Sequence, residues 1–380
     1  MSLEILASFS LGLLIGTIAG LIPGLHVNNM IPIVLGLTFF FDPLSASIIL
    51  IAASVSQVFI GFIPSTLLGA PEEETALSAL PGHRLMLQGR AYEAIKLTVI
   101  GSLGAMILSI LLLPIIAPFI KSIYTFIRPH LSYLLSIVAA YMILSGGTIK
   151  KKAYGAVVFI LSGLLGLISL DGFGSIMLFP LLTGLFGMPL LIDSIRTKTK
   201  LPESMTFEES PLTKKQLASS IGIGSIAGIL VGLLPGVGSS QAAIISQSLL
   251  KGKEGDADRQ FLVSIAGVNM SDMIYSVLAL WLLGNPRSGV AVAIGNLMEV
   301  GPNEVLIFIT AIVAAAGISA YLAKVSKTYF TDNASYSLQK SKHRCSSTTF
   351  NSHFNFYRAG GFIGGSNRLC NWTGCNILGH

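Results

Sequence analysis

The sequence predicts an all-α polytopic integral membrane protein with about nine or ten transmembrane helices in two structural repeats. Hydrophobic residues make up 52% of the 380 residues and charged residues only 11%, so the chain is far more apolar than a soluble protein. Apolar stretches of roughly 20 residues, long enough to cross a bilayer, recur from the N-terminus to about Tyr321. A Pro-Gly pair interrupts one such stretch in each half of the chain.

The two interruptions indicate the repeat. Pro23-Gly24 and Pro235-Gly236 lie 212 positions apart, and the glycines and leucine before the first pair recur at the same spacing. A second match, 215 positions apart, relates Leu-Leu-Gly-Ala-Pro at 67–71 to Leu-Leu-Gly-Asn-Pro at 282–286 and pairs Gln57 with Asp272. Because proline removes a backbone donor and glycine tolerates unusual dihedrals, each Pro-Gly pair should split a span into two half-helices. A simple helix kink is the alternative for either pair taken singly.

We expect the first repeat over residues 1–149. Its first span lacks a basic leading region and a small-residue cleavage site, so we interpret it as a retained helix rather than a signal peptide. The expected elements are a broken span from about Leu3 to Phe41, a span over 44–68, a polar loop or re-entrant turn over 69–96, and spans over 97–120 and 131–144.

Residues 150–215 are expected to hold linking spans and a polar cytoplasmic connector, with spans over 153–170 and 176–192 and the connector over 193–215. The second repeat should occupy residues 216–330, with a broken span over 216–250 and further spans over 261–283, 291–298 and 305–322. Residues 331–380 form an atypical polar tail.

The net charge of +6 comes from Lys and Arg in the loops between apolar spans. Membrane topology explains these residues through the positive-inside bias, so the expected partner is the lipid bilayer and not nucleic acid. The bias places Arg84, Arg90 and the 193–215 connector on the cytoplasmic side of the cell membrane and Asp42 outside. A cytoplasmic position for Arg259 requires that the second broken segment turns back to the side of the membrane on which it starts. Charge counting leaves open whether the repeats are inverted or parallel.

Polar residues follow both breaks, and they predict a binding site for an anion. A half-helix that starts in the membrane offers free N–H groups and partial positive charge, and Asn or Ser side chains can cap it. Two such breaks in matching halves indicate a solute site between them. The candidate solute-binding residues are Pro23, Gly24, Asn28, Asn29, Pro235, Gly236, Ser239, Ser240 and Gln241.

Asp272 is an acid within an otherwise apolar span, where a charge must be paired, hydrated or protonated. It could help bind Na⁺ or relay H⁺ together with its match Gln57, and the alternative is a structural hydrogen bond to a neighbouring helix. His26 could bind an anion or titrate, although a lone histidine more often satisfies one hydrogen bond. Asp171 more simply marks the end of a span.

Glu72 and Arg287 follow the equivalent prolines of the second sequence match. Since a twofold relation would bring them together, we expect one or more of Glu72, Glu73 and Glu74 to pair with Arg287 and to gate or buttress the site. The alternative is a set of solvated loop charges.

Enzyme chemistry has little support in the sequence. It contains no H-E-x-x-H or G-x-S-x-G motif and no paired intramembrane acids, and the glycine run at 222–228 lacks the setting of a nucleotide site. We therefore expect no enzymatic activity, no metal and no cofactor other than a coupling ion. An intramembrane enzyme or lipid-processing protein that uses Asp171, Asp272 and His26 is the alternative, but it does not explain the repeated Pro-Gly break.

Between about residues 11 and 298, the chain resembles the large membrane subunit of the tripartite tricarboxylate transporters, the TctA family. The resemblance rests on G-x-x-x-G-L-x-P-G in both halves, D-P-L-S-A at 42–46, the P-G-H-R-L-M-L-Q-G-R-A-Y-E-A segment at 81–94 and L-L-G-N-P-R-S-G at 282–289. It implies a secondary transporter that carries carboxylate anions with an ion gradient, together with a small membrane subunit and an extracytoplasmic binding protein.

The chain departs from the family pattern close to the expected site, as a divergent or archaeal-type member would. Glu72 and Arg287 stand where the resemblance implies small residues, and His26, Asn28 and Asn29 follow the first break in place of small or hydroxyl residues. These differences favour a carrier of di- or tricarboxylates in general over citrate in particular.

The composition of the tail differs from that of the predicted membrane spans. From about Ser341 it is polar and aperiodic, and it contains all three cysteines within its last 36 residues. Permitted codons for 345–356 can be chosen so that the next reading frame encodes an apolar span, so we hypothesise a frameshift, with a natural disordered tail as the alternative. Resequencing the gene tests this.

Overall fold

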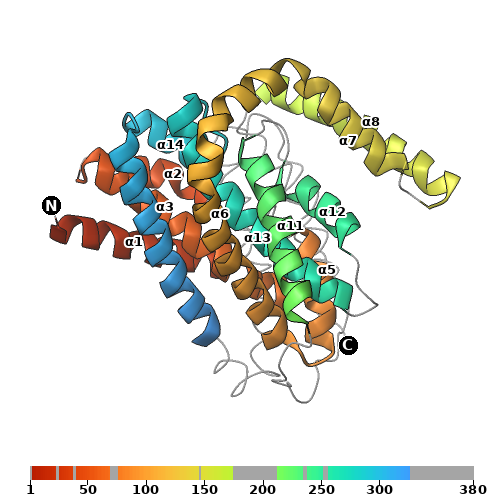
Figure 1. Ribbon diagram of the computed structural model, residues 1–380, viewed down its shortest axis with the longest axis horizontal. Helices are drawn as coiled ribbons and strands as arrows, with labels where there is room; N and C mark the ends of the chain where they lie inside the picture. Colours follow the sequence, from red (N-terminus) through yellow and green to blue (C-terminus); the bar gives the residue numbers. More distant parts are fainter. Residues whose placement is uncertain are drawn as a thin grey trace, which may run out of the picture.

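The computed structural model describes residues 2–22, 25–36, 40–68, 76–144, 147–173, 212–233, 238–250 and 256–325, and these ranges are helical with short connections (Figure 1). Seven of the described helices are long and apolar enough to cross a membrane. The prediction of a polytopic helical membrane protein is therefore confirmed. The span expected at 176–192, most of the connector and the tail beyond residue 325 lie outside the described residues.

The first part of the chain contains the expected broken span. Its helices are α1 (Ser2–Leu21), α2 (Val27–Gly36), α3 (Pro43–Ile60), α4 (Phe62–Leu68), α5 (Ala76–Leu87) and α6 (Ala91–Ile127). The expectation of a loop over 69–96 is corrected, because α5 and the start of α6 lie there. A short 3-10 turn η2 (Arg128–His130) then leads to α7 (Leu131–Leu144) and α8 (Ile149–Phe173).

The second part contains another interrupted segment, and its helices are α11 (Lys214–Leu233), α12 (Ser239–Leu249), α13 (Asp256–Leu283), α14 (Gly289–Leu297) and a helix over Pro302–Val325. Two segments that were expected to span the membrane form helices that are too short to do so. At 14 and 9 residues, α7 and α14 are too short to cross a hydrocarbon core alone, which needs roughly 20 residues.

Helices α1 and α3 lie side by side and run in the same direction. Gly12 and Gly16 of α1 face the backbone of Ile49 and Ala53 in α3, and a Cβ on either glycine would overlap a carbonyl oxygen. Glu4 and Asp42, at the two helix starts, also lie together. The Ser45 backbone N–H, with a smaller contribution from Glu4, holds the pKa of Asp42 below its ordinary value.

Helices α11 and α13 form a second pair with the same contacts. Gly224 and Gly228 of α11 face the backbone carbonyls of Ser264 and Val268 in α13. These glycines lie 212 positions after Gly12 and Gly16, and their partners lie 215 positions after Ile49 and Ala53. The two spacings found in the sequence are therefore the spacings of these close helix contacts.

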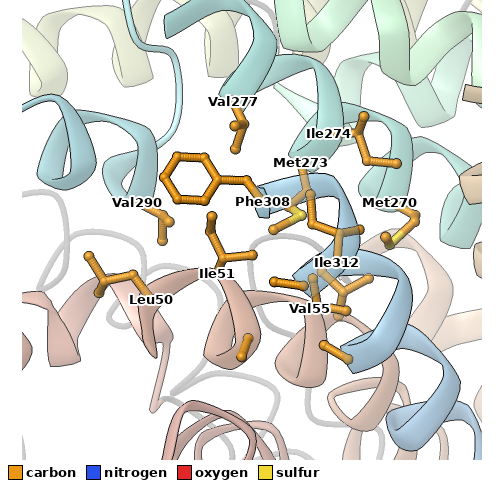
Figure 2. Close-up of a cluster of buried hydrophobic side chains, with 14 of the residues drawn as sticks. Leu50, Ile51, Val55, Met270, Met273, Ile274, Val277, Val290, Phe308 and Ile312 are labelled. Atoms are coloured by element: carbon orange, nitrogen blue, oxygen red, sulfur yellow. The ribbon is translucent and has the colours of Figure 1, made fainter. Parts of the chain in front are cut away.

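The two helix pairs run in opposite directions. Phe62, just beyond the end of α3, packs with Phe261 and Ile265 near the start of α13. Figure 2 shows the apolar cluster that joins the pairs, with Phe308 of the helix over Pro302–Val325 drawn between Ile51 from the first half of α3 and Val277 from the second half of α13. Helix α3 is thus antiparallel to α13, and α1 is antiparallel to α11.

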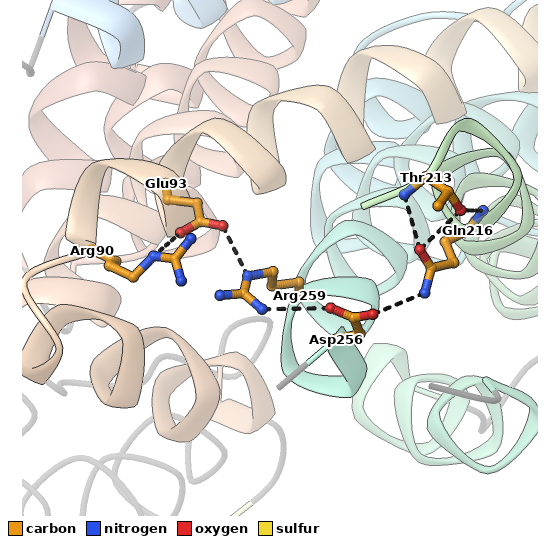
Figure 3. A network of polar contacts seen from close by, with 6 residues as sticks. All are labelled: Arg90, Glu93, Thr213, Gln216, Asp256 and Arg259. Carbon is orange, nitrogen blue, oxygen red and sulfur yellow. Dashed lines mark hydrogen bonds and ion pairs between the residues drawn. The ribbon is translucent and has the colours of Figure 1, made fainter. Parts of the chain in front are cut away.

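One end of the bundle is held by a chain of buried charges (Figure 3). Glu93 at the start of α6 pairs with Arg90 and accepts a hydrogen bond from Arg259 Nε at 2.8 Å. Arg259 Nη1 also lies 3.6 Å from Asp256 Oδ1, and Asp256 Oδ2 accepts a hydrogen bond from Gln216 Nε2 at 3.1 Å. Because Gln216 and Asp256 begin α11 and α13, the segment between them turns back to its starting side. Arg259 can therefore lie on the same side of the membrane as the basic residues before the second broken segment, as the positive-inside bias requires.

The α7 and α8 hairpin projects away from the rest of the bundle (Figure 1). Large apolar side chains along α8, such as Phe159, Leu161 and Ile168, are exposed. In a membrane protein such side chains face hydrocarbon rather than water, so this exposure fits a lipid environment.

The close approach of α11 and α13 makes a testable prediction. Gly228→Ala places a methyl group against the Val268 carbonyl, so we expect a loss of about 1–3 kcal/mol and a lower midpoint of thermal unfolding in detergent. Gly222→Ala is the matched control, because a Cβ at this position of the same helix has nothing within 4 Å. Equal midpoints for the two variants would contradict the packing account.

The buried charge chain makes a second prediction. Glu93→Gln removes the carboxylate between Arg90 and Arg259 and should cost about 3 kcal/mol, measured as a lower unfolding midpoint of the purified protein. Arg84→Gln is the control, because Arg84 pairs with Asp258 with 60% of its side chain exposed and should matter by less than about 1 kcal/mol. A Glu93→Gln protein as stable as the control would show that the charge chain does not hold the helix starts together.

Candidate functional site

The half-helix after the first break is held by Gln57. This residue belongs to α3, is buried, and accepts a hydrogen bond from the Val27 N–H at 2.9 Å through Oε1. Its Nε2 donates to the Leu25 carbonyl at 3.4 Å. Because Val27 is the first residue of α2, the amide of Gln57 satisfies backbone groups that the interrupted helix leaves unpaired.

His26 occupies the position before α2, and its Nδ1 accepts a hydrogen bond from the Asn28 N–H at 3.1 Å. The expectation that Asn28 or Asn29 caps this half-helix is therefore corrected, since both lie within its first turn. The side chain of Asn28 is exposed and lies against Gly289, where a Cβ would come within 2.7 Å of Asn28 Oδ1.

At the second break, α11 ends at Leu233 and α12 begins at Ser239. Gly238 precedes the helix, and its carbonyl accepts from the Ala242 N–H at 3.2 Å, so Gly238 takes the capping position expected for a serine. Arg287 Nη2 donates to the Val231 carbonyl at 3.1 Å. A guanidinium at this place complements the negative end of the α11 dipole.

The loop between α13 and α14, residues 284–288, lies next to both broken segments. Gly284 has a φ of +59°, which turns the chain after α13, and Asn285 Nδ2 donates to the Tyr124 hydroxyl of α6. Ser288 caps α14 by accepting from the Ala291 N–H at 3.1 Å. Arg287 reaches the end of α11, while the adjoining Gly289 touches Asn28 at the start of α2. Both broken segments therefore meet at this loop.

Asp272 lies beside the same loop. Its Oδ1 accepts from Ser276 Oγ at 3.2 Å, and its backbone carbonyl lies against Gly232 near the end of α11. Burial lowers the pKa of Arg287, while the negative charge of Asp272 opposes this shift and favours the charged guanidinium. An exposed amide, a guanidinium and a carboxylate thus lie around one loop.

Several predicted site residues lie outside what the structure describes. These are Pro23, Gly24, Pro235, Gly236 and Glu72 to Glu74 as a whole, and the side chains of Asn29, Ser240 and Gln241. Ser239 is the first residue of α12, and Asp171 lies within α8. Within the described residues, no group of three His, Cys, Asp or Glu could hold a metal ion.

Sequence reasoning missed the roles of Tyr124 and Ser288, and it did not recognise Gln57 as a capping residue. A serine directly before an apolar run is a known helix-start signal, so Ser288 could have been found. Tyr124 and Gln57 act on partners 161 and 30 positions away, which no local signal marks.

A bundle of apolar helices, with two broken segments that meet at a polar loop, has the architecture of a membrane carrier. The chain belongs to the tripartite tricarboxylate transporter TctA family, which it matches over residues 6–344. It is a multi-pass membrane protein of a transport family and not an enzyme.

Two curated relatives are similar to the chain over more than half of its length. The chain is 36% identical over 291 residues to an uncharacterised protein of Methanocaldococcus jannaschii, covering 75% of this chain and 70% of the relative. It is 27% identical over 260 residues to an uncharacterised 52.8 kDa protein of Agrobacterium vitis, covering 63% of this chain and 51% of that protein. No solved structure matches the chain.

The capping role of Gln57 can be tested directly. Gln57→Leu leaves the buried Val27 N–H without its acceptor, so amide hydrogen exchange over residues 25–30 should become faster and stability should fall by about 1–3 kcal/mol. Ser47→Ala in the same helix is the control, because the Ser47 hydroxyl donates only to the Pro43 carbonyl of its own turn. Unchanged exchange in Gln57→Leu would mean that α2 does not depend on this bond.

Proposed function

We propose that this protein is a secondary active transporter that moves a di- or tricarboxylate across the cytoplasmic membrane with an ion gradient. The observation that carries the proposal is the meeting of both broken segments at the 284–288 loop, in a chain of a tricarboxylate transporter family. Polar backbone within a membrane is tolerated where it lines a cavity or is buried in protein, and carriers place such breaks at the solute.

We further propose that the chain contains two inverted repeats. The matched contacts of Gly16 with Ala53 and of Gly228 with Val268 support this, as does the opposite direction of the two helix pairs. Ser56 and Ser271, 215 positions apart, also share hydroxyl hydrogen bonds with neighbouring helices, through Thr17 at 3.0 Å and Ser109 at 2.8 Å. Inverted repeats with a solute at their interface are a common basis of alternating access.

The interface between the pairs suits such a movement. Within each pair, glycines bring the backbones into contact and fix the register. Between the pairs, α3 meets α13 through side chains such as Val55, Met270 and Met273 (Figure 2). Because methionine is unbranched and adaptable, this apolar surface can repack as one pair moves against the other.

Asp272 and Gln57 are the proposed coupling residues, with Na⁺ or H⁺ as the ion. An acid on an apolar span beside a cationic loop must exchange partners or protons when an anion enters. The family is that of a tripartite system, so we propose a small membrane subunit and an extracytoplasmic binding protein as partners. The alternative, an intramembrane enzyme, does not account for the family match.

Transport is tested by reconstituting the purified protein in liposomes and measuring uptake of labelled citrate, succinate and malate with an imposed Na⁺ or H⁺ gradient. Gradient-dependent accumulation of at least one carboxylate is expected. If accessory subunits deliver the solute, binding in detergent should still raise the unfolding midpoint of this subunit alone. If none of the three carboxylates is taken up and none stabilises the protein, the proposed function is contradicted.

The site assignment makes a further prediction. Asn28→Leu removes the exposed amide that lies against Gly289. The apparent affinity for a carboxylate, measured from the ligand-dependent rise in the unfolding midpoint, should fall about tenfold while the protein stays folded. Gln247→Leu is the control, because Gln247 is also an exposed amide on a half-helix but lies near the end of α12, away from the break. Wild-type affinity in Asn28→Leu would remove this residue from the site.

A further inference from the structure

Helix α6 belongs to the first half of the chain but packs along the second helix pair. Gly101 of α6 faces the backbone of Val263 in α13, and a Cβ at this glycine would overlap the Val263 carbonyl oxygen. One turn further, Gly104 faces the side chain of Ile221 in α11, which fills the space a Cβ would need. Helix α6 is therefore in close contact with both helices of the second pair.

Buried hydrogen bonds join α6 to α13 over several turns. The Ser102 hydroxyl donates to the Ala266 carbonyl at 3.3 Å, and the Ser109 hydroxyl donates to the Ser271 hydroxyl at 2.8 Å. The Tyr275 hydroxyl donates in turn to the Ser109 carbonyl at 3.2 Å. The buried charge chain continues this row at the helix starts (Figure 3). Separating the two helices would leave these groups without partners inside a membrane, which is costly, so α6 and α13 should move together.

Two shorter helices join the same group. Leu85 of α5 packs with Leu262 of α13 and with Leu217 of α11, although α5 also belongs to the first half of the chain. Ala242 of the half-helix α12 packs with Val268 of α13. The group around the second pair therefore includes α5, α6 and α12.

Helix α14 makes the opposite crossing. It belongs to the second half of the chain but packs on α2 and α3 of the first half. Val290 of α14 lies in the apolar cluster that contains Leu50 and Ile51 of α3 (Figure 2). Gly289, the first residue of α14, lies against Asn28 of α2. Each half of the chain thus sends a helix to the group formed by the other half.

The chain passes from one group to the other within the 284–288 loop. The first part of the loop is attached to the second group, because Asn285 donates to the Tyr124 hydroxyl of α6 and Arg287 donates to the Val231 carbonyl of α11. Directly after Arg287, the chain enters the serine cap of α14 and with it the first group. The boundary between the groups therefore falls at the end of this loop.

This position gives the second sequence match a structural context. The Leu-Leu-Gly-Asn-Pro motif at 282–286 stands directly before the crossing to α14. The matching Leu-Leu-Gly-Ala-Pro motif at 67–71 stands before α5, which is the helix that leaves the first half. In each half, the motif therefore precedes the helix that joins the other group.

We propose that the transporter moves as two units that exchange helices between the repeats. One unit contains α1, α2, α3 and α14, the other contains α5, α6, α11, α12 and α13, and the 284–288 loop bends between them. This inference rests on the proposed function and identifies its moving parts. The buried charge chain then stays intact through the transport cycle. The proposed solute site lies where the units meet, with Asn28 on one unit and Arg287 on the other.

The experiment measures distances between pairs of spin labels on the full chain in liposomes by pulsed electron resonance, with and without citrate or succinate in sodium buffer. The labels are attached at Leu14→Cys of α1, Ile107→Cys of α6 and Ile226→Cys of α11. These side chains are 57%, 56% and 58% exposed, so the labels leave the core undisturbed. All native cysteines lie in the last 36 residues and are first replaced by serine.

The two label pairs separate the proposed units from the repeats. The Ile107 and Ile226 labels are in different repeats but in one unit, so their distance should change by less than about 1 Å when the solute binds. The Ile107 and Leu14 labels are in one repeat but in different units, so their distance should change by about 2 Å or more.

The reverse result would show that the repeats themselves are the moving units and would overturn the inference. A change in both distances, or in neither while the solute binds, would overturn it as well. Binding to each labelled protein is checked by the rise in its unfolding midpoint. Leu111→Cys, on the same helix and 64% exposed, replaces Ile107→Cys if that label prevents folding. If the labelled proteins bind a carboxylate, the transporter assignment stands whichever distances change. If no carboxylate stabilises even the wild type, the proposed function fails and this inference fails with it.

Discussion

A helix that stops inside a membrane leaves backbone N–H and C=O groups that lipid cannot hydrate, and each such group costs several kcal/mol unless the protein supplies a partner. This constraint shapes the centre of the molecule. At the first break, the amide of Gln57 reaches from α3 to the backbone of Leu25 and Val27. At the second, Arg287 reaches from the 284–288 loop to the Val231 carbonyl. The polar groups that make the breaks tolerable are also the groups that we propose to surround a solute.

The supports of the two breaks differ in a way that bears on transport. Gln57 is neutral, and its amide hydrogen-bonds the backbone of Val27 and Leu25, which fixes the start of α2. Arg287 carries a charge, and the negative charge of Asp272 favours its charged form. One side of the centre is therefore held by neutral contacts, while the other holds charges that an entering anion can rearrange.

The rest of the bundle divides into parts that are tightly joined and parts that are not. Glycines allow α1 to touch α3 and α11 to touch α13 along their backbones, and the charge chain from Arg90 to Gln216 ties α6 to the second pair (Figure 3). The contact between the pairs is an apolar cluster that also includes Phe308 and Ile312 of the helix over Pro302–Val325 (Figure 2). Movement is easiest where no backbone contact or buried charge has to be broken, which is between the pairs.

The sequence by itself determined the membrane class, the existence of both interruptions and the two spacings of 212 and 215 positions, because these depend on local composition and on repeated residues. It also singled out Gln57, Asp272 and Arg287 by their matches and their chemistry. It missed that α5 is a helix and that α7 and α14 are too short to span, since hydropathy marks apolar stretches but not where each helix ends.

Only the tertiary structure decided which groups meet. The direction of the helix pairs could not be read from loop charges, because the same charges fit either arrangement until the contact between Gln216 and Asp256 returned the second broken segment to its starting side. The partners of Gln57 and Arg287 lie 30 and 56 positions away along the chain. Contacts over such separations come from the packing of whole helices, and no local pattern of residues encodes them.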